Sequence, residues 1–83
     1  MENFYVNKKI LVTGAAGTVG SEIVRQLYAC NPVELRLVDN NETEMFFLME
    51  QYRNTNVFCF LGDVRDRDKI EKLSHGIDIK RVY

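Results

Sequence analysis

The sequence lacks an excess of charge of either sign. Eleven Lys and Arg residues stand against twelve Asp and Glu residues, giving a formal net charge of −1, so no basic footprint for nucleic acid is present. Also missing is any apolar run near the eighteen or so residues that a membrane helix needs, and Met1-Glu2-Asn3 does not open a signal peptide. This composition argues against a nucleic-acid or membrane partner and predicts a cytoplasmic location.

Cysteine and proline are scarce. Cys30 and Cys59 stand apart without metal-ligand spacing. A disulfide is not expected in a reducing compartment, so both are interpreted as packing residues and no metal site is predicted. The one proline, Pro32, stands where a helix is expected to end. With 83 residues and no linker, repeat or low-complexity stretch, residues 1–83 are predicted to form a single, truncated domain.

The sequence does contain a regular alternation of strand and helix patterns. Apolar runs predict strands over about 9–12, 34–38 and 57–61, and the opening of a fourth strand at about 81. Amphipathic patterns predict helices over about 18–29 and 66–74, with another helix following Asn41. Short connections between such elements imply parallel strands joined by right-handed crossovers. The predicted fold class is α/β, the first half of a Rossmann-type doubly wound parallel sheet: three βα units and the start of a fourth strand.

The middle helix and the third strand carry more specific expectations. Asn41 and Glu44 have the spacing of a capping box, in which each side chain accepts a backbone N–H of the other residue. Phe46 and Phe47 widen the apolar stripe of this helix. Core packing is the favoured interpretation, and a subunit contact or burial beneath a second domain is the alternative. The unbroken apolar run 57–61 predicts a strand covered on both faces.

A glycine-rich turn, T-G-A-A-G-T-V-G, joins the first predicted strand to the first predicted helix. Gly14 would let the chain turn off the strand, Gly17 would let backbone approach a phosphate, and Gly20 would let the helix pack closely on the sheet. Such a turn presents backbone N–H groups to the pyrophosphate of a dinucleotide. For the glycines alone, an ordinary tight connection has equal weight. The candidate cofactor contacts in the turn are Gly14, Ala16, Gly17, Thr18, Val19 and Gly20.

Asp39 ends the second apolar run, about twenty residues after the glycines, and Asn40 follows it. A carboxylate at this point can accept hydrogen bonds from both ribose hydroxyls of adenosine, and it would repel the 2′-phosphate of NADP. The alternative is that Asp39 only begins a polar loop. Its distance from the glycine turn favours the first interpretation, with NAD as the cofactor and Asp39 and Asn40 as contacts.

Asp63 and Val64 follow the third predicted strand, at the carboxyl edge where open parallel sheets bind their ligands. The Asp63 carboxylate can accept from the amino group of adenine while the backbone N–H of Val64 donates to a ring nitrogen. An alternative of equal weight makes Asp63 the cap of the next helix. The alternating charges of residues 65–69 are interpreted as a solvated helix face.

From Lys9 onward the sequence resembles the start of the extended short-chain dehydrogenase/reductases, in the segments T-G-A-A-G-T-V-G-S-E-I-V-R-Q-L, N-P, L-V-D-N-N-E and L-G-D-V-R-D-R-D. Within that superfamily it is most similar to bacterial polysaccharide-biosynthesis proteins, which include UDP-N-acetylglucosamine 4,6-dehydratases and related epimerases. The resemblance assigns Gly14, Gly17 and Gly20 to the pyrophosphate. It assigns Asp39 to the adenosine ribose, and Asp63 with Val64 to the adenine.

The resemblance also implies a chemistry. Members of this group oxidise C4 of a nucleotide sugar by hydride transfer to the nicotinamide, eliminate water across C5–C6 and return the hydride, with Ser or Thr and a Tyr-x-x-x-Lys pair as acid and base. Tyr83 is not the tyrosine of such a pair, because no lysine follows it at this spacing and it is expected to lie inside the fourth strand. Many of the dehydratases hold a 2′-phosphate with a basic residue after the second strand. Asn40, Asn41 and Thr43 stand there instead, which favours NAD over NADP.

The favoured hypothesis is the cofactor-binding N-terminal portion of a nucleotide-sugar dehydratase or epimerase, with a nucleotide sugar as substrate of the full-length parent. These 83 residues alone are expected to have no turnover, because the groups that exchange protons are missing. One alternative is a non-enzymatic dinucleotide-binding module, and another is an extended reductase acting on a substrate other than a sugar. Each of these three hypotheses is compatible with a homo-oligomer.

Overall fold

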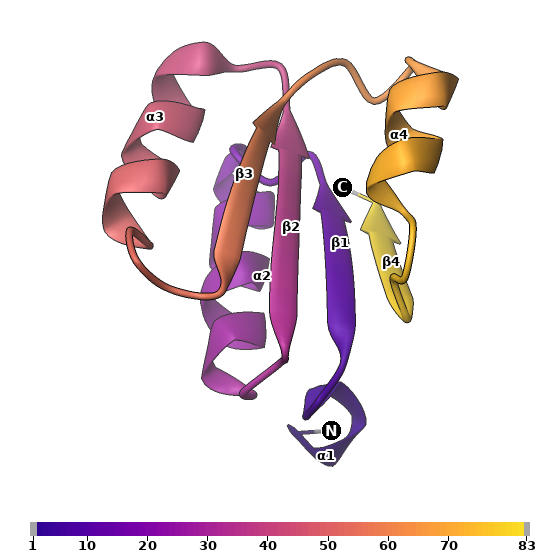
Figure 1. The fold of residues 1–83 in the computed structure, drawn as a ribbon. Helices are drawn as coiled ribbons and strands as arrows, with labels where there is room; N and C mark the ends of the chain where they lie inside the picture. Colours follow the sequence, from indigo (N-terminus) through magenta and orange to yellow (C-terminus); the bar gives the residue numbers. More distant parts are fainter. Residues whose placement is uncertain (1, 83) are drawn as a thin grey trace.

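Four parallel strands lie side by side in one sheet, in the order β3-β2-β1-β4, and helices connect them (Figure 1). A computed structural model describes residues 2–82 of the chain. Its elements in chain order are α1 (Glu2–Tyr5), β1 (Lys9–Thr13), α2 (Thr18–Ala29), β2 (Glu34–Asp39), α3 (Glu42–Gln51), β3 (Val57–Leu61), α4 (Arg67–Leu73) and β4 (Ile79–Val82). The predicted α/β alternation and parallel sheet are confirmed. The short helix α1 was not predicted, and β4 begins earlier than the expected start at Arg81.

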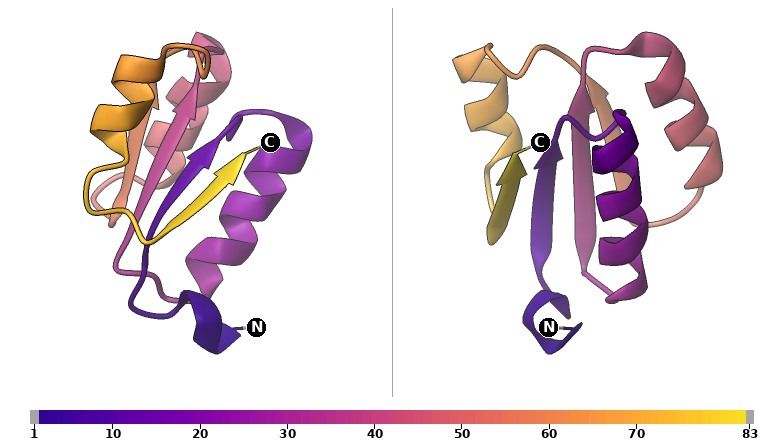
Figure 2. Two further views of the ribbon diagram at one scale, coloured as in Figure 1. Left: turned by 90° about the vertical axis from the view of Figure 1, so that its right-hand side faces the viewer. Right: turned by 180° about the vertical axis from the view of Figure 1, so that it is seen from behind.

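The sheet has a core on each face because successive side chains of a strand point to opposite sides. Ile10 and Val12 of β1 belong to the larger core, together with buried residues of α2 and α3. Leu11, between them in the sequence, belongs to a smaller core with Val38 and with Ile70 of α4. The two views in Figure 2 accordingly place α2 and α4 on opposite sides of the sheet.

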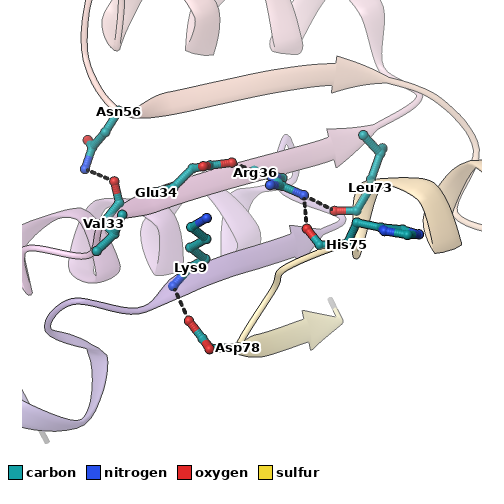
Figure 3. A network of polar contacts seen from close by, with 8 residues as sticks. All are labelled: Lys9, Val33, Glu34, Arg36, Asn56, Leu73, His75 and Asp78. Atoms are coloured by element: carbon teal, nitrogen blue, oxygen red, sulfur yellow. Dashed lines mark hydrogen bonds and ion pairs between the residues drawn. The ribbon is translucent and has the colours of Figure 1, made fainter.

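Helix α4 is attached to the sheet through the side chain of Arg36. This residue of β2 points to the α4 side, where Nη1 donates to the carbonyls of Leu73 (2.9 Å) and His75 (2.8 Å) at the end of the helix (Figure 3). The guanidinium also pairs with Glu34. A cation at the C-terminus of a helix satisfies carbonyls that have no intrahelical partner and opposes the helix dipole. Arg36 therefore sets the position of α4 over β2.

The amino ends of the strands are held by side chains that bond to backbone. The carboxylate of Asp78 accepts the backbone N–H of Lys9 at 2.9 Å, which joins the approach to β4 with the start of β1 (Figure 3). The amide of Asn56 donates to the carbonyls of Pro32 and Val33, joining the approaches to β3 and β2. These contacts fix the end of the sheet at which the strands begin, opposite to their carboxyl ends.

The three longer helices begin in two different ways. The Asn41 side chain accepts the N–H of Glu44 (3.1 Å) at the start of α3, and the Asp66 side chain accepts the N–H of Lys69 (3.2 Å) at the start of α4. Only half of the predicted capping box forms at α3, because the N–H of Asn41 donates to Asp39. At α2 the N-cap is Gly17, which has no side chain to cap with.

Substituting the α3 cap should lower stability by a modest, measurable amount. For Asn41→Ala we expect a loss of about 1 kcal/mol in the free energy of unfolding, since the N–H of Glu44 loses its acceptor. Asn41→Asp retains an acceptor and adds charge at the positive end of the helix, so it should be as stable as the wild type. Urea denaturation followed by circular dichroism measures both free energies of unfolding, and equal stability of the two variants would show that the side-chain acceptor contributes nothing.

Two predictions about packing were wrong within this chain. Phe46 and Phe47 are 57% and 60% exposed, so they are not part of the core. Helix α3 buries Met45 and Leu48, and its periodicity turns the two phenylalanines outward. Strand β3 is not covered on both faces either: it lies at the edge of the sheet, and Phe58 is 48% exposed.

The remaining expectations concern the two cysteines and the membrane. Cys30 and Cys59 are free thiols packed at the margin of the larger core, which confirms their interpretation as packing residues. Burial raises the pKa of the Cys59 thiol above its ordinary value, so little reactive thiolate forms there at neutral pH.

Between residues 2 and 82, no helix combines the length and the apolar character that crossing a bilayer requires.

Candidate functional site

The carboxyl ends of the strands gather three loops at one edge of the sheet. All four strands point toward the same edge, from which the chain leaves for α2, α3 and α4 (Figure 1). After β3 the chain returns to place β4 on the other side of β1. Strand order reverses beside β1, and open α/β sheets bind ligands at such a point. A pocket of about 150 Å³ lies at the carboxyl ends of β1, β2 and β3, lined by Gly14, Asp39, Asn40 and Val64. We call it the edge pocket.

The glycines of the first turn have distinct geometries. Gly14 has φ of 73°, in the left-handed region that favours glycine, and the chain turns off β1 there. A Cβ on Gly20 would lie 2.0 Å from the carbonyl oxygen of Gly14, so only glycine allows α2 to approach the turn this closely. Gly17 has φ of −72°, and a Cβ there would meet nothing nearer than 3.8 Å. The space beside Gly17, where a side chain would lie, is therefore open.

The start of α2 presents backbone donors without acceptors. In the part of the chain that the structure describes, the N–H groups of Gly17, Thr18 and Val19 have no hydrogen-bond partner. The side chains of Thr18 and Val19 are exposed, so water or a ligand reaches this end of the helix. These donors lie at the positive end of the helix dipole, where an anion is stabilised.

Asp39 connects the glycine turn with the loop that follows β2. Its Oδ2 accepts the backbone N–H of Ala16 at 3.1 Å, and its Oδ1 accepts the N–H of Asn41 at 2.9 Å. A carboxylate oxygen has two acceptor positions, so each oxygen of Asp39 retains one. Asp39 therefore does more than begin a polar loop: it orders the edge pocket and still offers two acceptors.

Asp63 does not cap α4, so that alternative is wrong: Asp66 is the cap. The Asp63 carboxylate binds Arg65 instead, accepting its backbone N–H (2.8 Å) and its Nη2–H (2.7 Å), with Nε 3.0 Å and 3.1 Å from the two oxygens. These hydrogen bonds lower the pKa of Asp63 well below its ordinary value of 3.8, to about 2. Asp63 is therefore ionised over the physiological pH range, where it can accept hydrogen bonds but cannot donate one.

The depressed pKa of Asp63 can be measured directly. A carbon-detected NMR titration should place it at about 2 in the wild type, and Arg65→Ala should bring it back toward 3.8 because both the fork and the positive charge are lost. Since the folded pKa is depressed, the pair stabilises the fold above pH 3.8 and loses its effect as pH falls through about 2. Arg67→Ala is the control, and an equal rise in that variant would contradict the assignment.

The structure thus brings most of the predicted residues to one place. Gly14, Asp39, Asn40 and Val64 line the edge pocket, and the N–H of Ala16 binds Asp39. The other predicted positions are at or beside the start of α2, namely Gly17, Thr18, Val19 and Gly20. Asp63 lies next to Val64 but is paired with Arg65, a partner that sequence analysis missed. The signal was an acidic residue two positions before an arginine at the end of a strand.

A family model for the polysaccharide biosynthesis proteins matches residues 10–83. The chain belongs to this family. An uncharacterized membrane protein of Methanocaldococcus jannaschii is 42% identical to it, over 95% of this chain and 24% of that protein. The UDP-glucose 4-epimerase of Pisum sativum is 35% identical, over 81% of this chain and 21% of that protein.

Solved structures carry the same fold as this family member. The Bordetella bronchiseptica enzyme WbmF, crystallised with NAD⁺ and UDP, superposes with a TM-score of 0.78 at 20% identity, covering all of this chain and 24% of WbmF. This chain therefore spans about a fifth to a quarter of the length of these three proteins.

Proposed function

We propose that residues 1–83 are the cofactor-binding portion of a nucleotide-sugar dehydratase or epimerase of polysaccharide biosynthesis, and that NAD binds across the edge pocket. The observation that carries this proposal is the arrangement around Asp39: two unused carboxylate acceptors lie beside a helix end whose donors are also unused. The adenosine half of a dinucleotide needs both, since its ribose has two adjacent hydroxyls and its pyrophosphate is an anion.

Each part of the cofactor has a place in this arrangement. The N–H groups of Gly17, Thr18 and Val19 would donate to the pyrophosphate, and the absence of a Cβ on Gly17 leaves room for it. The remaining acceptor on each oxygen of Asp39 would receive one ribose hydroxyl. Val64, which lines the pocket, would donate its N–H to the adenine, with Asp63 beside it. Gly14 and Gly20 contribute through the shape of the turn.

NAD fits this site better than NADP. A 2′-phosphate would stand close to the ionised Asp39 carboxylate, and Asn40 is the other pocket residue on that loop. Neither neighbour offers a positive charge to offset that repulsion. WbmF, with the same fold, was crystallised with NAD⁺, which supports the same choice.

The chain would hold the cofactor rather than carry out the whole reaction. Bound NAD would supply a hydride acceptor for the sugar, while these residues orient the adenosine half and stabilise its charge. The acid and base groups of such a reaction are not among these residues, so we expect no turnover from them alone. The Pisum sativum relative is an epimerase of UDP-glucose and WbmF was crystallised with UDP, which supports a nucleotide sugar as substrate. A cytoplasmic location is part of the proposal, and the two free thiols suit a reducing compartment.

An NMR titration of the ¹⁵N-labelled 83-residue chain tests this proposal. NAD and ADP-ribose should shift the amides of Gly17, Thr18 and Val64 to the same extent, with weak affinity, because only the adenosine half has contacts here. Nicotinamide alone, which has no phosphate, ribose or adenine, should leave these amides unshifted, and it serves as the control ligand. No saturable shift with NAD, or shifts confined to another surface, would refute the proposal. Nanomolar affinity would contradict the assignment of only half the cofactor contacts to this chain.

A further inference from the structure

Strand β3 has one edge that no other strand of residues 2–82 covers (Figure 1). Successive residues of a strand direct their N–H and C=O groups to opposite sides. The carbonyl of Asn56, just before β3, accepts the N–H of Leu35 of β2 at 3.0 Å, so the even-numbered residues of β3 bond to β2. Val57, Cys59 and Leu61 therefore direct their backbone groups to the free edge.

Side chains of this chain already occupy the two ends of the free edge. Thr55 Oγ1 accepts the N–H of Val57 at 3.2 Å, and Lys69 Nζ donates to the carbonyl of Leu61. The carbonyl of Val57, both backbone groups of Cys59 and the N–H of Leu61 have no partner among the described residues. Two donors and two acceptors thus remain open in the middle of the edge.

These four groups match those of a second copy that runs in the opposite direction. If two β3 strands pair antiparallel about a two-fold axis at Cys59, the two Cys59 residues exchange both of their hydrogen bonds. The N–H of Leu61 then donates to the carbonyl of Val57 in the other copy, and the reverse. Every open group is used, and the groups left over are those that Thr55 and Lys69 hold. Moving the axis by one residue in either direction would use only half of the open groups.

The side chains of β3 favour the same pairing. None of its residues is charged or proline, although such residues are a common means by which edge strands avoid pairing. With the axis at Cys59, the half-exposed Phe58 lies opposite Phe60 of the other copy, twice in each dimer. Aromatic pairs across an antiparallel ladder stabilise it. A groove of about 400 Å³ borders this edge, lined by Phe58, Phe60 and Met49 among others, so the edge is accessible.

The apolar surface continues from β3 onto α3. Phe46 and Met49 of α3 are both more than half exposed, and both line a hollow of about 230 Å³ beside β3. Exposed apolar surface of this kind marks an interaction site. The two-fold axis is perpendicular to the sheet, so α3 of each copy lies on the same face and the helices run antiparallel. The acidic first turn of one, with Glu42 and Glu44, is then level with Arg53 of the other.

We propose that the free edge of β3 and the adjoining side of α3 form an interface with a second copy of this chain, in which two β3 strands pair antiparallel about a two-fold axis at Cys59. The two sheets then become one continuous sheet. The match in register and in side chains selects a second copy over a strand of another protein. None of the residues that line the edge pocket belongs to this interface, so the inference does not depend on cofactor binding.

Analytical ultracentrifugation of the 83-residue chain over a range of concentrations tests this inference. The wild type should shift from the monomer mass of 9.7 kDa to twice that mass as the concentration rises. Phe58→Lys should weaken association about tenfold or more, because two aromatic contacts per dimer are lost and charge enters the junction. Phe4→Lys is the matched control: Phe4 is 56% exposed but lies on α1, so this variant should associate like the wild type.

Amide hydrogen exchange in the wild type locates the contact without any substitution. The N–H groups of Cys59 and Leu61 should exchange much more slowly at millimolar than at micromolar concentration, because only the dimer gives them acceptors. The N–H groups of Thr18 and Val64 also have no partner among residues 2–82, but they lie away from the junction. Their exchange should stay fast at both concentrations, which makes them the internal control.

Three results would overturn the inference. The first is a monomer mass that persists to millimolar concentration, which would leave the edge open to a strand of a different protein. The second is a dimer in which Cys59 and Leu61 exchange as fast as in the monomer, because its contact would then lie elsewhere. The third is equal association of Phe58→Lys and Phe4→Lys, with the amide spectrum of each dilute variant showing that it is folded.

Discussion

Replacing Gly20 by alanine is expected to destabilise the chain by about 3 kcal/mol or more. A Cβ there would lie 2.0 Å from the carbonyl oxygen of Gly14 and 3.0 Å from the Cα of Ala15. Both are backbone atoms, so no rotamer change relieves the overlap, and α2 must move away from the turn. Alanine normally favours a helix over glycine by up to about 1 kcal/mol, and the overlap should outweigh that gain. Thermal unfolding should show a midpoint lower by roughly 10 °C or more.

Gly17→Ala is the matched control for this substitution. The residue lies in the same turn, but its φ of −72° suits any amino acid, and a Cβ would meet nothing nearer than 3.8 Å. We expect a change in stability within about 1 kcal/mol. Binding of NAD should nevertheless fall, because the new methyl group would occupy the approach to the N–H groups of α2. If both variants were equally stable, the close contact of Gly20 with the turn would be refuted.

Asp39→Ala should weaken NAD binding about tenfold or more while weakening NADP binding much less. The variant loses two acceptors for ribose hydroxyls, and each hydrogen bond to a charged group contributes about 1.5–3 kcal/mol. It also removes the carboxylate that opposes a 2′-phosphate, so the loss for NADP is partly offset. Because Asp39 also accepts the N–H groups of Ala16 and Asn41, the free energy of unfolding should fall by about 1–2 kcal/mol. Calorimetric titration with both dinucleotides gives the ratio of dissociation constants.

A second carboxylate separates the two roles of Asp39. Asp78 also accepts a backbone N–H, that of Lys9 at 2.9 Å, but at the opposite edge of the sheet. Asp78→Ala should therefore lower stability and leave the ratio of NAD to NADP affinity unchanged. An unchanged ratio in Asp39→Ala would remove Asp39 from the ribose role, whatever its effect on stability.

Sequence analysis located the helices and strands well because their signals are local. The apolar runs, Pro32 and the glycine turn each depend on neighbouring residues, and the observed β1, α2, β2 and β3 follow them closely. It failed for Phe46 and Phe47, since hydrophobic character alone does not say which face of α3 meets the sheet. It also placed Arg65 on a solvated helix, whereas α4 begins at Arg67 and Arg65 binds back to Asp63.

By itself, then, the sequence determined the parallel α/β fold and the positions where a glycine or a carboxylate is required, because backbone geometry and periodicity act over a few residues. Only the tertiary structure decided which of these positions meet. The strand order β3-β2-β1-β4 brings Val64 to Gly14 and Asp39 in the edge pocket and leaves β3 at an exposed edge. Such contacts join residues far apart in the chain, and they depend on how whole strands are placed, which no local pattern specifies.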